Sequence, residues 1–261
     1  MYRDTEVSDV DWGATSYEEI QATGNRDGSI ALVPVGSVEQ HGTHMPVATD
    51  SILVEAVACA GAQRVSDEIP ILVTPTEWVG SSPHHMSFGG TITGSFDTLL
   101  DLLEAIGGCA IENGFDAVLF VNGHGGNRAL VESVPRILGP EYPDTDVHAC
   151  TYFDLPDSEY INEIRESDHG GMAHAGEFET ALMLHLYPEL VDESSLDGTM
   201  REVDMFGDGS QTAGYVDFAD LSDTGAAGNP QPATARVGEK FFAEASEQLA
   251  EVLRNVSEIN N

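Results

Sequence analysis

Strand-favouring runs alternate with helical patterns along most of this chain, and this alternation restricts the folds that it can adopt. The runs stand at residues 31–35, 69–74, 117–121 and 146–151. Segments with apolar residues at helical intervals follow them and close the chain, at 51–65, 97–113, 128–138 and 237–256. We predict that the runs are buried strands and that the helices cover them. The sequence therefore predicts an α/β fold.

Potential metal ligands follow the run 31–35 directly. Side chains of an extended chain alternate between two sides, so Glu39 and His41 are predicted to point the same way. A bend after them brings Asp50 back toward the same point from the start of the next helix. A polar loop that ends in a helix-capping Asp50 is the simpler alternative for any one of these residues. Together with His44, the set favours a site for a divalent metal ion.

The run 117–121 leads into the glycine-rich turn 122–127, which contains His124. Open α/β sheets bind their ligands at such strand-to-helix turns. The glycine spacing is not G-x-G-x-x-G and there is no Walker lysine, so a nucleotide loop is a poor match. We expect His124 to be a metal ligand, with Gly125 and Gly126 contacting the substrate. The alternative is an incidental histidine at a capped helix start.

A third set of polar residues precedes a helical pattern near residue 180. His174 and Glu177 are three positions apart and share one face if both are helical, a spacing that Glu/His metal sites use in helical bundles. Glu179 is then predicted to point well away from that face. His185 is expected to be a surface histidine or a satisfied core histidine.

Two polar stretches are predicted to lie near the site. Residues 77–91 hold two adjacent histidines and several serines beside glycines, which suits a substrate loop. Ser82 and His85 are our candidates for substrate contacts there, and neither histidine is expected to bind metal. The stretch 192–228 is interpreted as an excursion near the site mouth. For each of the two stretches, a solvated loop is the competing interpretation.

The charge balance is extreme. Lysine and arginine total 10 against 45 aspartates and glutamates, and the formal net charge is −35. Such a surface repels nucleic acid and anionic membranes, so neither is an expected partner. We interpret the acidity as adaptation to high salt, where screening removes most of the self-repulsion. An acidic surface for a partner protein is the alternative, but it predicts one acidic block, whereas these carboxylates are spread along the chain.

Cysteine usage and the amino terminus favour a cytoplasmic enzyme. The three cysteines stand far apart with no C-x-x-C spacing, which indicates small buried side chains in a reducing compartment. Residues 1–12 are acidic and have no apolar core, unlike a signal peptide. No run approaches the roughly 18 apolar residues of a membrane span.

Taken in order, three of these segments resemble the motifs of the creatininase (creatinine amidohydrolase) family. The matching residues are 34–44 with 49–50, 122–127 and 174–180. In addition, 88–91 resembles the family's Phe-Pro-Gly-Thr with glycine in place of proline, and 228–234 resembles a late family segment. The resemblance runs from about residue 30 to residue 245, and three linked motifs are far more specific than any one.

The resemblance implies a three-layer α/β/α sandwich with a mostly parallel central sheet, formed as one domain over residues 1–261. It also implies two divalent ions per chain, Zn, Mn or Fe, and hydrolysis of a carbon–nitrogen amide bond. Members of the family are often hexamers, so the resemblance implies a homo-oligomer.

The family pattern assigns ligands position by position. It places Glu39 and His124 on one ion, His41 on the other and Asp50 between them. Creatininases take a further ligand from a glutamate at the position of Gly126, so the carry-over fails there. Glu177 is the expected replacement, as in relatives that share the glycine pair, and His44 is a candidate to support a ligand.

The expected function is hydrolysis of a cyclic or formyl amide, creatinine to creatine or a related amide. Relatives with this glycine pair include formamidopyrimidine deformylases of flavin and deazaflavin synthesis and the mycofactocin peptidase, which are the alternatives. Metal ions can lower the pKa of bound water to about 7 and polarise the amide carbonyl. His174 is expected to protonate the leaving nitrogen, and an orienting role is the competing assignment.

Two other classes of function are compared with this one. A Ser/His/Asp hydrolase needs an exposed nucleophile turn such as G-x-S-x-G, which the sequence lacks. A non-catalytic, metal-binding oligomer would keep the ligands but lose an open coordination position. Metal content without hydrolysis of any amide would distinguish that protein from an enzyme.

Overall fold

A parallel sheet forms the centre of the fold in the computed structural model, which describes residues 9–168, 170–198 and 215–259. Its four strands have the order β2-β1-β3-β4, and every neighbouring pair is parallel. The strands are β1 (Ile30–Val35), β2 (Ile71–Val73), β3 (Ala117–Asn122) and β4 (Asp146–Thr151). All four lie within or next to the runs that the sequence indicated.

Eight α-helices are assigned among the described residues. They are α1 (Tyr17–Gly24), α2 (Thr49–Val65), α3 (Phe96–Glu112), α4 (Arg128–Glu141), α5 (Ser158–Ile164), α6 (Glu177–Leu186), α7 (Phe218–Leu221) and α8 (Ala235–Ile259). The predicted long helices are all present. The largest difference is at α6, which begins at Glu177 and leaves His174 outside the helix.

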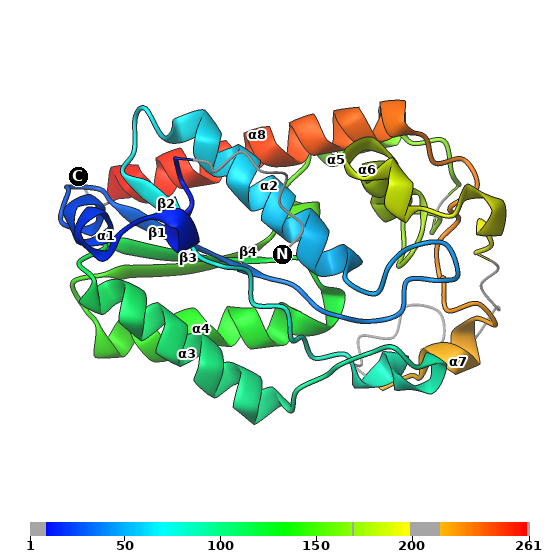
Figure 1. The fold of residues 1–261 in the computed structure, drawn as a ribbon, viewed down its shortest axis with the longest axis horizontal. Coiled ribbons are helices and arrows are strands. Elements are labelled where there is room, and N and C mark those ends of the chain that lie inside the picture. Colours follow the sequence, from blue (N-terminus) through cyan, green and yellow to red (C-terminus); the bar gives the residue numbers. More distant parts are fainter. Residues whose placement is uncertain (1–8, 169, 199–214, 260–261) are drawn as a thin grey trace.

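The helices form two layers, one on each face of the sheet (Figure 1). Helices α2 and α8, with α6 beside them, cover one face, and α3 and α4 cover the other. Within β1, Ile30 and Leu32 pack toward the first layer, whereas Ala31 and Val33 pack toward the second. A strand buried on both faces is apolar at every position, which is why the run has no polar alternation. The predicted three-layer α/β/α sandwich is confirmed.

Local capping explains where several helices begin. The Ser16 side chain accepts a hydrogen bond from the backbone N–H of Glu19, and the Glu19 carboxylate accepts one from the backbone N–H of Ser16, which makes a capping box at α1. Ser95 caps α3 by accepting from the N–H of Thr98. Such caps satisfy backbone donors that the helix leaves unpaired.

Helices α6 and α8 cross at close range because α8 has a glycine at the crossing. A Cβ atom added to Gly238 would overlap the backbone carbonyl oxygen of Ala181. Backbone cannot yield as a flexible side chain can, so this position requires glycine. The crossing holds α6, and therefore the segment that leads into it, against the rest of the helical layer.

We expect Gly238→Ala to lower the free energy of unfolding by about 2 kcal/mol or more, because the new methyl group forces the two helices apart. Urea unfolding in high salt, followed by circular dichroism, measures the change.

The matched control is Gly108→Ala in α3, where the added Cβ meets only the Tyr142 hydroxyl, at 3.3 Å. In both variants, alanine stabilises the helix by roughly 1 kcal/mol relative to glycine. Because the control introduces no overlap with the backbone, it is expected to be neutral or stabilising. Equal stability of the two variants would contradict the close crossing.

Among the described residues, no helix is both long and apolar enough to cross a membrane. The three cysteines are free thiols; Cys59 and Cys150 are partly buried, but Cys109 is exposed, so the expectation of a buried side chain is wrong there.

Candidate metal centre

Three segments that are distant in sequence meet beyond the carboxyl ends of β1 and β3. They are the loop from β1 together with the first turn of α2, the turn after β3, and the segment that leads into α6 together with the first turn of α6. Their donor atoms form three overlapping groups in which all atoms lie within 4.8 Å of one another. The groups are Glu39, Asp50 and His124; His41, Asp50 and Glu179; and Glu39, His41 and His174. The sequence predicted a site at this edge of the sheet.

Asp50 belongs to two of these groups because its two oxygens face different imidazoles. Oδ2 lies 3.0 Å from Nδ1 of His124, and Oδ1 lies 3.1 Å from Nε2 of His41. Asp50 stands in the first turn of α2, but the N-cap is Ala48 and no side chain caps this helix. The carboxylate therefore faces the other donors and does not serve as a helix cap, the simpler alternative for this residue.

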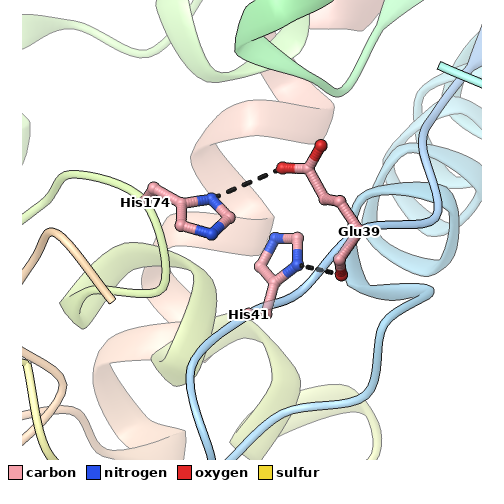
Figure 2. Close-up of side chains that lie close together, drawn as sticks. All are labelled: Glu39, His41 and His174. Carbon is pink, nitrogen blue, oxygen red and sulfur yellow. Dashed lines mark hydrogen bonds and ion pairs between the residues drawn. The ribbon is translucent and has the colours of Figure 1, made fainter. Parts of the chain in front are cut away.

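Glu39 occupies the centre of the cluster and is fully buried. One of its oxygens, Oε2, lies 3.1 Å from Nδ1 of His124. The other, Oε1, lies 3.5 Å from Nδ1 of His174, the upper contact in Figure 2, and 3.2 Å from Nε2 of His85. One carboxylate thus faces three imidazoles.

The backbone orients the ring of His41. Its Nδ1 lies 3.2 Å from the backbone carbonyl oxygen of Glu39, as Figure 2 shows, and a carbonyl can only accept a hydrogen bond. Nδ1 therefore donates to this carbonyl, and Nε2 faces the carboxylates of Asp50, at 3.1 Å, and Glu179, at 3.8 Å. A ring oriented by a backbone carbonyl in this way is typical of metal-binding histidines.

The charges in the cluster perturb one another strongly. Burial alone would lower the pKa of His41, but Asp50 and the other carboxylates raise it to about 10. At His124, burial again acts to lower the pKa. Glu39 and Asp50 nevertheless raise the pKa of His124 well above its usual value. For Glu179, burial raises the carboxyl pKa to about 7. The carboxylates therefore favour positive charge on the neighbouring groups of the cluster.

A divalent cation fits this environment better than protons do. Glu39 Oε1 and Asp50 Oδ2 are buried, and among the described residues no donor is aligned to give either oxygen a hydrogen bond. Unsatisfied carboxylate oxygens of this kind are costly unless a cation meets them. Carboxylate and imidazole together are the donor types that Zn²⁺ and Mn²⁺ take. The residues present therefore fit a metal centre.

Ser82 supports the ligands and does not contact the substrate cavity. Its hydroxyl donates to Oε2 of Glu39 at 2.5 Å and lies 3.0 Å from Nε2 of His124 and 2.6 Å from the Ser37 hydroxyl. The side chain is fully buried behind the two ligands and is absent from the cavity wall. This corrects the expectation of a substrate contact, because the loop folds its serine inward against the carboxylate.

His85 and His174 are neutral rings at the edge of the cluster. Burial lowers the pKa of His85 to about 3, and burial followed by the neighbouring His41 lowers that of His174 well below its usual value. The side-chain nitrogen of Gln40 lies 2.7 Å from Nδ1 of His85, and Nε2 of His174 lies 2.8 Å from the backbone oxygen of Gln40. Both rings line the cavity, as does the glycine pair Gly125–Gly126.

Gly126 admits no side chain. A Cβ at this position would overlap Nε2 of His124 and the backbone oxygen of Ser81, whereas a Cβ at Gly125 would meet nothing within 4 Å. A side-chain ligand at position 126 is therefore excluded in the present backbone. In the family pattern a glutamate at this position supplies a metal ligand. In this chain such a ligand would have to come from another segment.

Glu179, and not Glu177, lies within the donor groups. The Glu177 carboxylate accepts hydrogen bonds from the backbone N–H groups of Glu166 and Ser167, each at 2.7 Å, and belongs to none of the donor groups. The prediction failed because it assumed one helix through His174 and Glu177. The helix instead starts at Glu177, after Ala175 with a positive φ of 53°, so the spacing rule does not apply.

A cavity of about 430 Å³ opens beside the donor groups. Its wall includes the donor residues Glu39, Asp50, His124 and Glu179, with His174 and the glycine pair. Apolar side chains and one arginine complete it: Phe153, Ile161, Met172, Phe178, Phe218 and Arg165. Phe218 lies in the excursion 192–228, and its ring centroid is 4.1 Å from that of His85. Part of this excursion therefore reaches the site, although residues 199–214 are outside the described residues.

The comparisons with known proteins agree with this geometry. The family model for creatininase, described as creatinine amidohydrolase, matches residues 14–253. The chain belongs to the creatininase family. It is 35% identical over 220 residues to a mycofactocin precursor peptide peptidase of Mycobacterium ulcerans (strain Agy99), and the matched region covers 82% of this chain and 80% of the relative. It is 30% identical over 200 residues to the creatinine amidohydrolase of Pseudomonas putida, covering 69% and 73%.

Solved creatininases share the fold. The structure described as "Creatininase Mn" superposes with a TM-score of 0.82 at 26% identity, covering 95% of this chain and 98% of that one. A mutant creatininase of the "Zn-Zn type" has a TM-score of 0.78 at 27% identity, covering 96% and 98%. Manganese and zinc forms are thus known for proteins with this architecture, and the clusters of this chain offer the corresponding donor types.

We expect Glu179→Gln to lower the metal content from two ions per chain to one, because it removes a donor from the His41 group. Glu177→Gln is the matched control, since it makes the same change two residues away, and it is expected to retain both ions. Elemental analysis after gel filtration, with circular dichroism to confirm folding, makes the measurement. Loss of an ion from the Glu177 variant alone would reverse the assignment.

Proposed function

We propose that the protein is a metal-dependent amidohydrolase that uses two divalent ions per chain, Zn, Mn or Fe. The observation that carries this proposal is the position of Asp50, whose two oxygens face two separate groups of donors. A bridging carboxylate is the typical means of holding two ions close together. Glu39 and His124 complete one set of ligands, and His41 and Glu179 complete the other.

Bound ions supply an acidified water and a Lewis acid for the amide carbonyl, and the chain supplies the remaining functions. Hydrolysis adds hydroxide to the acyl carbon, breaks the C–N bond and leaves the nitrogen in need of a proton. His174 is placed to transfer that proton, because its ring lines the cavity and its Nδ1 lies 3.5 Å from the Glu39 carboxylate. An orienting role remains the competing assignment, since His174 also belongs to a donor group.

The nature of the cavity favours a peptide-type amide over creatinine. Three phenylalanines, an isoleucine and a methionine line it, which offers apolar surface for a side chain next to the scissile bond. The mycofactocin peptidase relative, at 35% identity over 220 residues, is named for action on a peptide. Creatinine is the second candidate substrate, supported by the 30% identity to the Pseudomonas putida enzyme. A formyl amide is a third substrate to include in the assay.

The setting proposed for this activity is the cytoplasm of a cell with high internal salt. A net charge of −35 supports it, because screening by salt is what makes such a surface tolerable. Free cysteines are consistent with a reducing compartment. We also propose that the chain acts as one domain over residues 1–261 within a homo-oligomer such as a hexamer, without nucleic acid or membrane as a partner.

A hydrolysis screen tests the proposal. Protein in high salt, loaded with Zn²⁺, Mn²⁺ or Fe²⁺, is offered small peptides, formamidopyrimidines and creatinine, and amine release is measured. We expect cleavage of peptide amides, loss of activity with a chelator and recovery when metal is restored. Chelator-resistant activity would favour a serine hydrolase, and bound metal without cleavage of any amide would favour a non-catalytic metal protein.

Asp50→Asn is expected to lose both ions and to lower kcat/KM on the order of 10³-fold or more, because metal activation contributes several kcal/mol to such reactions. The control Asp97→Asn removes the same charge from an exposed position in α3 and is expected to keep full metal content and activity. Full activity of the Asp50 variant would contradict the two-ion site.

A further inference from the structure

Arg165 is the only lysine or arginine in the described wall of the cavity that contains the metal ligands. The whole chain has 10 such residues against 45 acidic ones, so a cation at this place is unusual. It also has no role in the ligand groups, where cations would compete with the metal. Its presence therefore requires a separate explanation.

The guanidinium of Arg165 is available for a ligand. Arg64, Arg128 and Arg254 each form an ion pair with a carboxylate, but in the described part of the chain Arg165 forms none. Its Nε donates to the backbone oxygen of Ser167 at 2.8 Å. That contact fixes the side chain and leaves the two terminal nitrogens, which can bind a carboxylate with two parallel hydrogen bonds.

A buried carboxylate holds the backbone that carries Arg165. Glu177 is fully buried and accepts the N–H groups of the next two residues, Glu166 and Ser167, each at 2.7 Å. The turn after α5 is therefore tied to the first residue of α6. A surface arginine needs no such support, whereas an arginine that must present its charge to a ligand does.

The surroundings strengthen an ionic contact at this point. Ile161, Met172 and the phenylalanines line the same cavity wall as Arg165, which is itself partly buried. A charge pair is worth more in such a low-dielectric site than in water. Apolar walls beside one cation also suit a ligand that carries both an apolar side chain and a carboxylate.

We infer that Arg165 binds a carboxylate of the substrate, and that the enzyme acts on the carboxyl-terminal amide bond of a peptide or on an N-acyl amino acid. The apolar wall receives the terminal side chain, and the metal ligands receive the amide. Glu177 acts as a positioning residue for Arg165. This inference rests on the proposed amidohydrolase function and specifies its substrate class.

Binding of a matched pair of compounds tests the inference. The probes are acetyl-Ala-Phe with a free carboxylate and the same compound with a carboxyl-terminal amide, titrated into metal-loaded full-length protein by calorimetry. We expect the wild type to prefer the free acid by about 10-fold or more, the loss typical when a charged hydrogen-bond partner is removed. Arg165→Gln is expected to reduce this preference to near unity, and Arg165→Lys to restore part of it.

Arg136→Gln is the matched control, since it removes the same charge from an exposed position in α4 and is expected to keep the preference. Glu177→Gln is expected to weaken the preference while keeping both ions, which separates positioning from metal binding. Equal binding of the two compounds by the wild type, binding of neither, or an unchanged preference in Arg165→Gln would overturn the inference.

The hydrolysis of the same pair distinguishes this inference from the function on which it rests. If the wild type cleaves both compounds at equal kcat/KM and binds them equally, the amidohydrolase function stands and the role of Arg165 is wrong. If the wild type binds the acid selectively through Arg165 but cleaves neither compound with any metal, the role of Arg165 stands and the enzymatic proposal fails.

Discussion

The concentration of buried negative charge at the ends of β1 and β3 is the constraint on which the rest of the site depends. Glu39, Asp50 and Glu179 bring three carboxylates close together, the first two buried and Glu179 partly buried. Their mutual repulsion is severe at low dielectric, so the folded chain must supply positive charge. The raised pKa values of His41 and His124 are one answer, and bound cations are another that also leaves both imidazoles neutral as ligands.

The hydrophobic core of the fold lies apart from this polar cluster and supports it. The strands are apolar on both faces, and two helical layers cover them, so the sheet stays rigid up to the point where the polar residues begin. Hydroxyls then fix the ligands: Ser82 bonds both Glu39 and His124, and Ser37 bonds Ser82. Such contacts hold donor atoms in position before a metal arrives, which raises affinity. A close approach at Gly126 completes the packing.

The donor residues that depend on local rules could be predicted from the sequence, whereas Glu179, whose position depends on a helix boundary, could not. Glu39 and His41 follow a strand, where alternation is reliable, and His124 follows the next. Glu179 was missed because the start of a helix decides which side chain faces the site, and helix boundaries are uncertain by a few residues. Gly176, directly before Glu177, was the available signal, since glycine is among the residues accepted at a helix N-cap. The position of Arg165 at the cavity could not be predicted, because it depends on how distant segments pack together.

An anionic substrate is compatible with so acidic a protein because the two effects act over different distances. The net charge of −35 is spread over the surface, and its repulsion extends only about one screening length, roughly 3 Å at 1 M salt. A contact between a carboxylate and Arg165 takes place inside a cavity with apolar walls, where screening is weaker. High salt therefore removes the long-range barrier to an anion while it leaves most of the local attraction. The same acidity would make recognition of such a substrate difficult in a dilute medium.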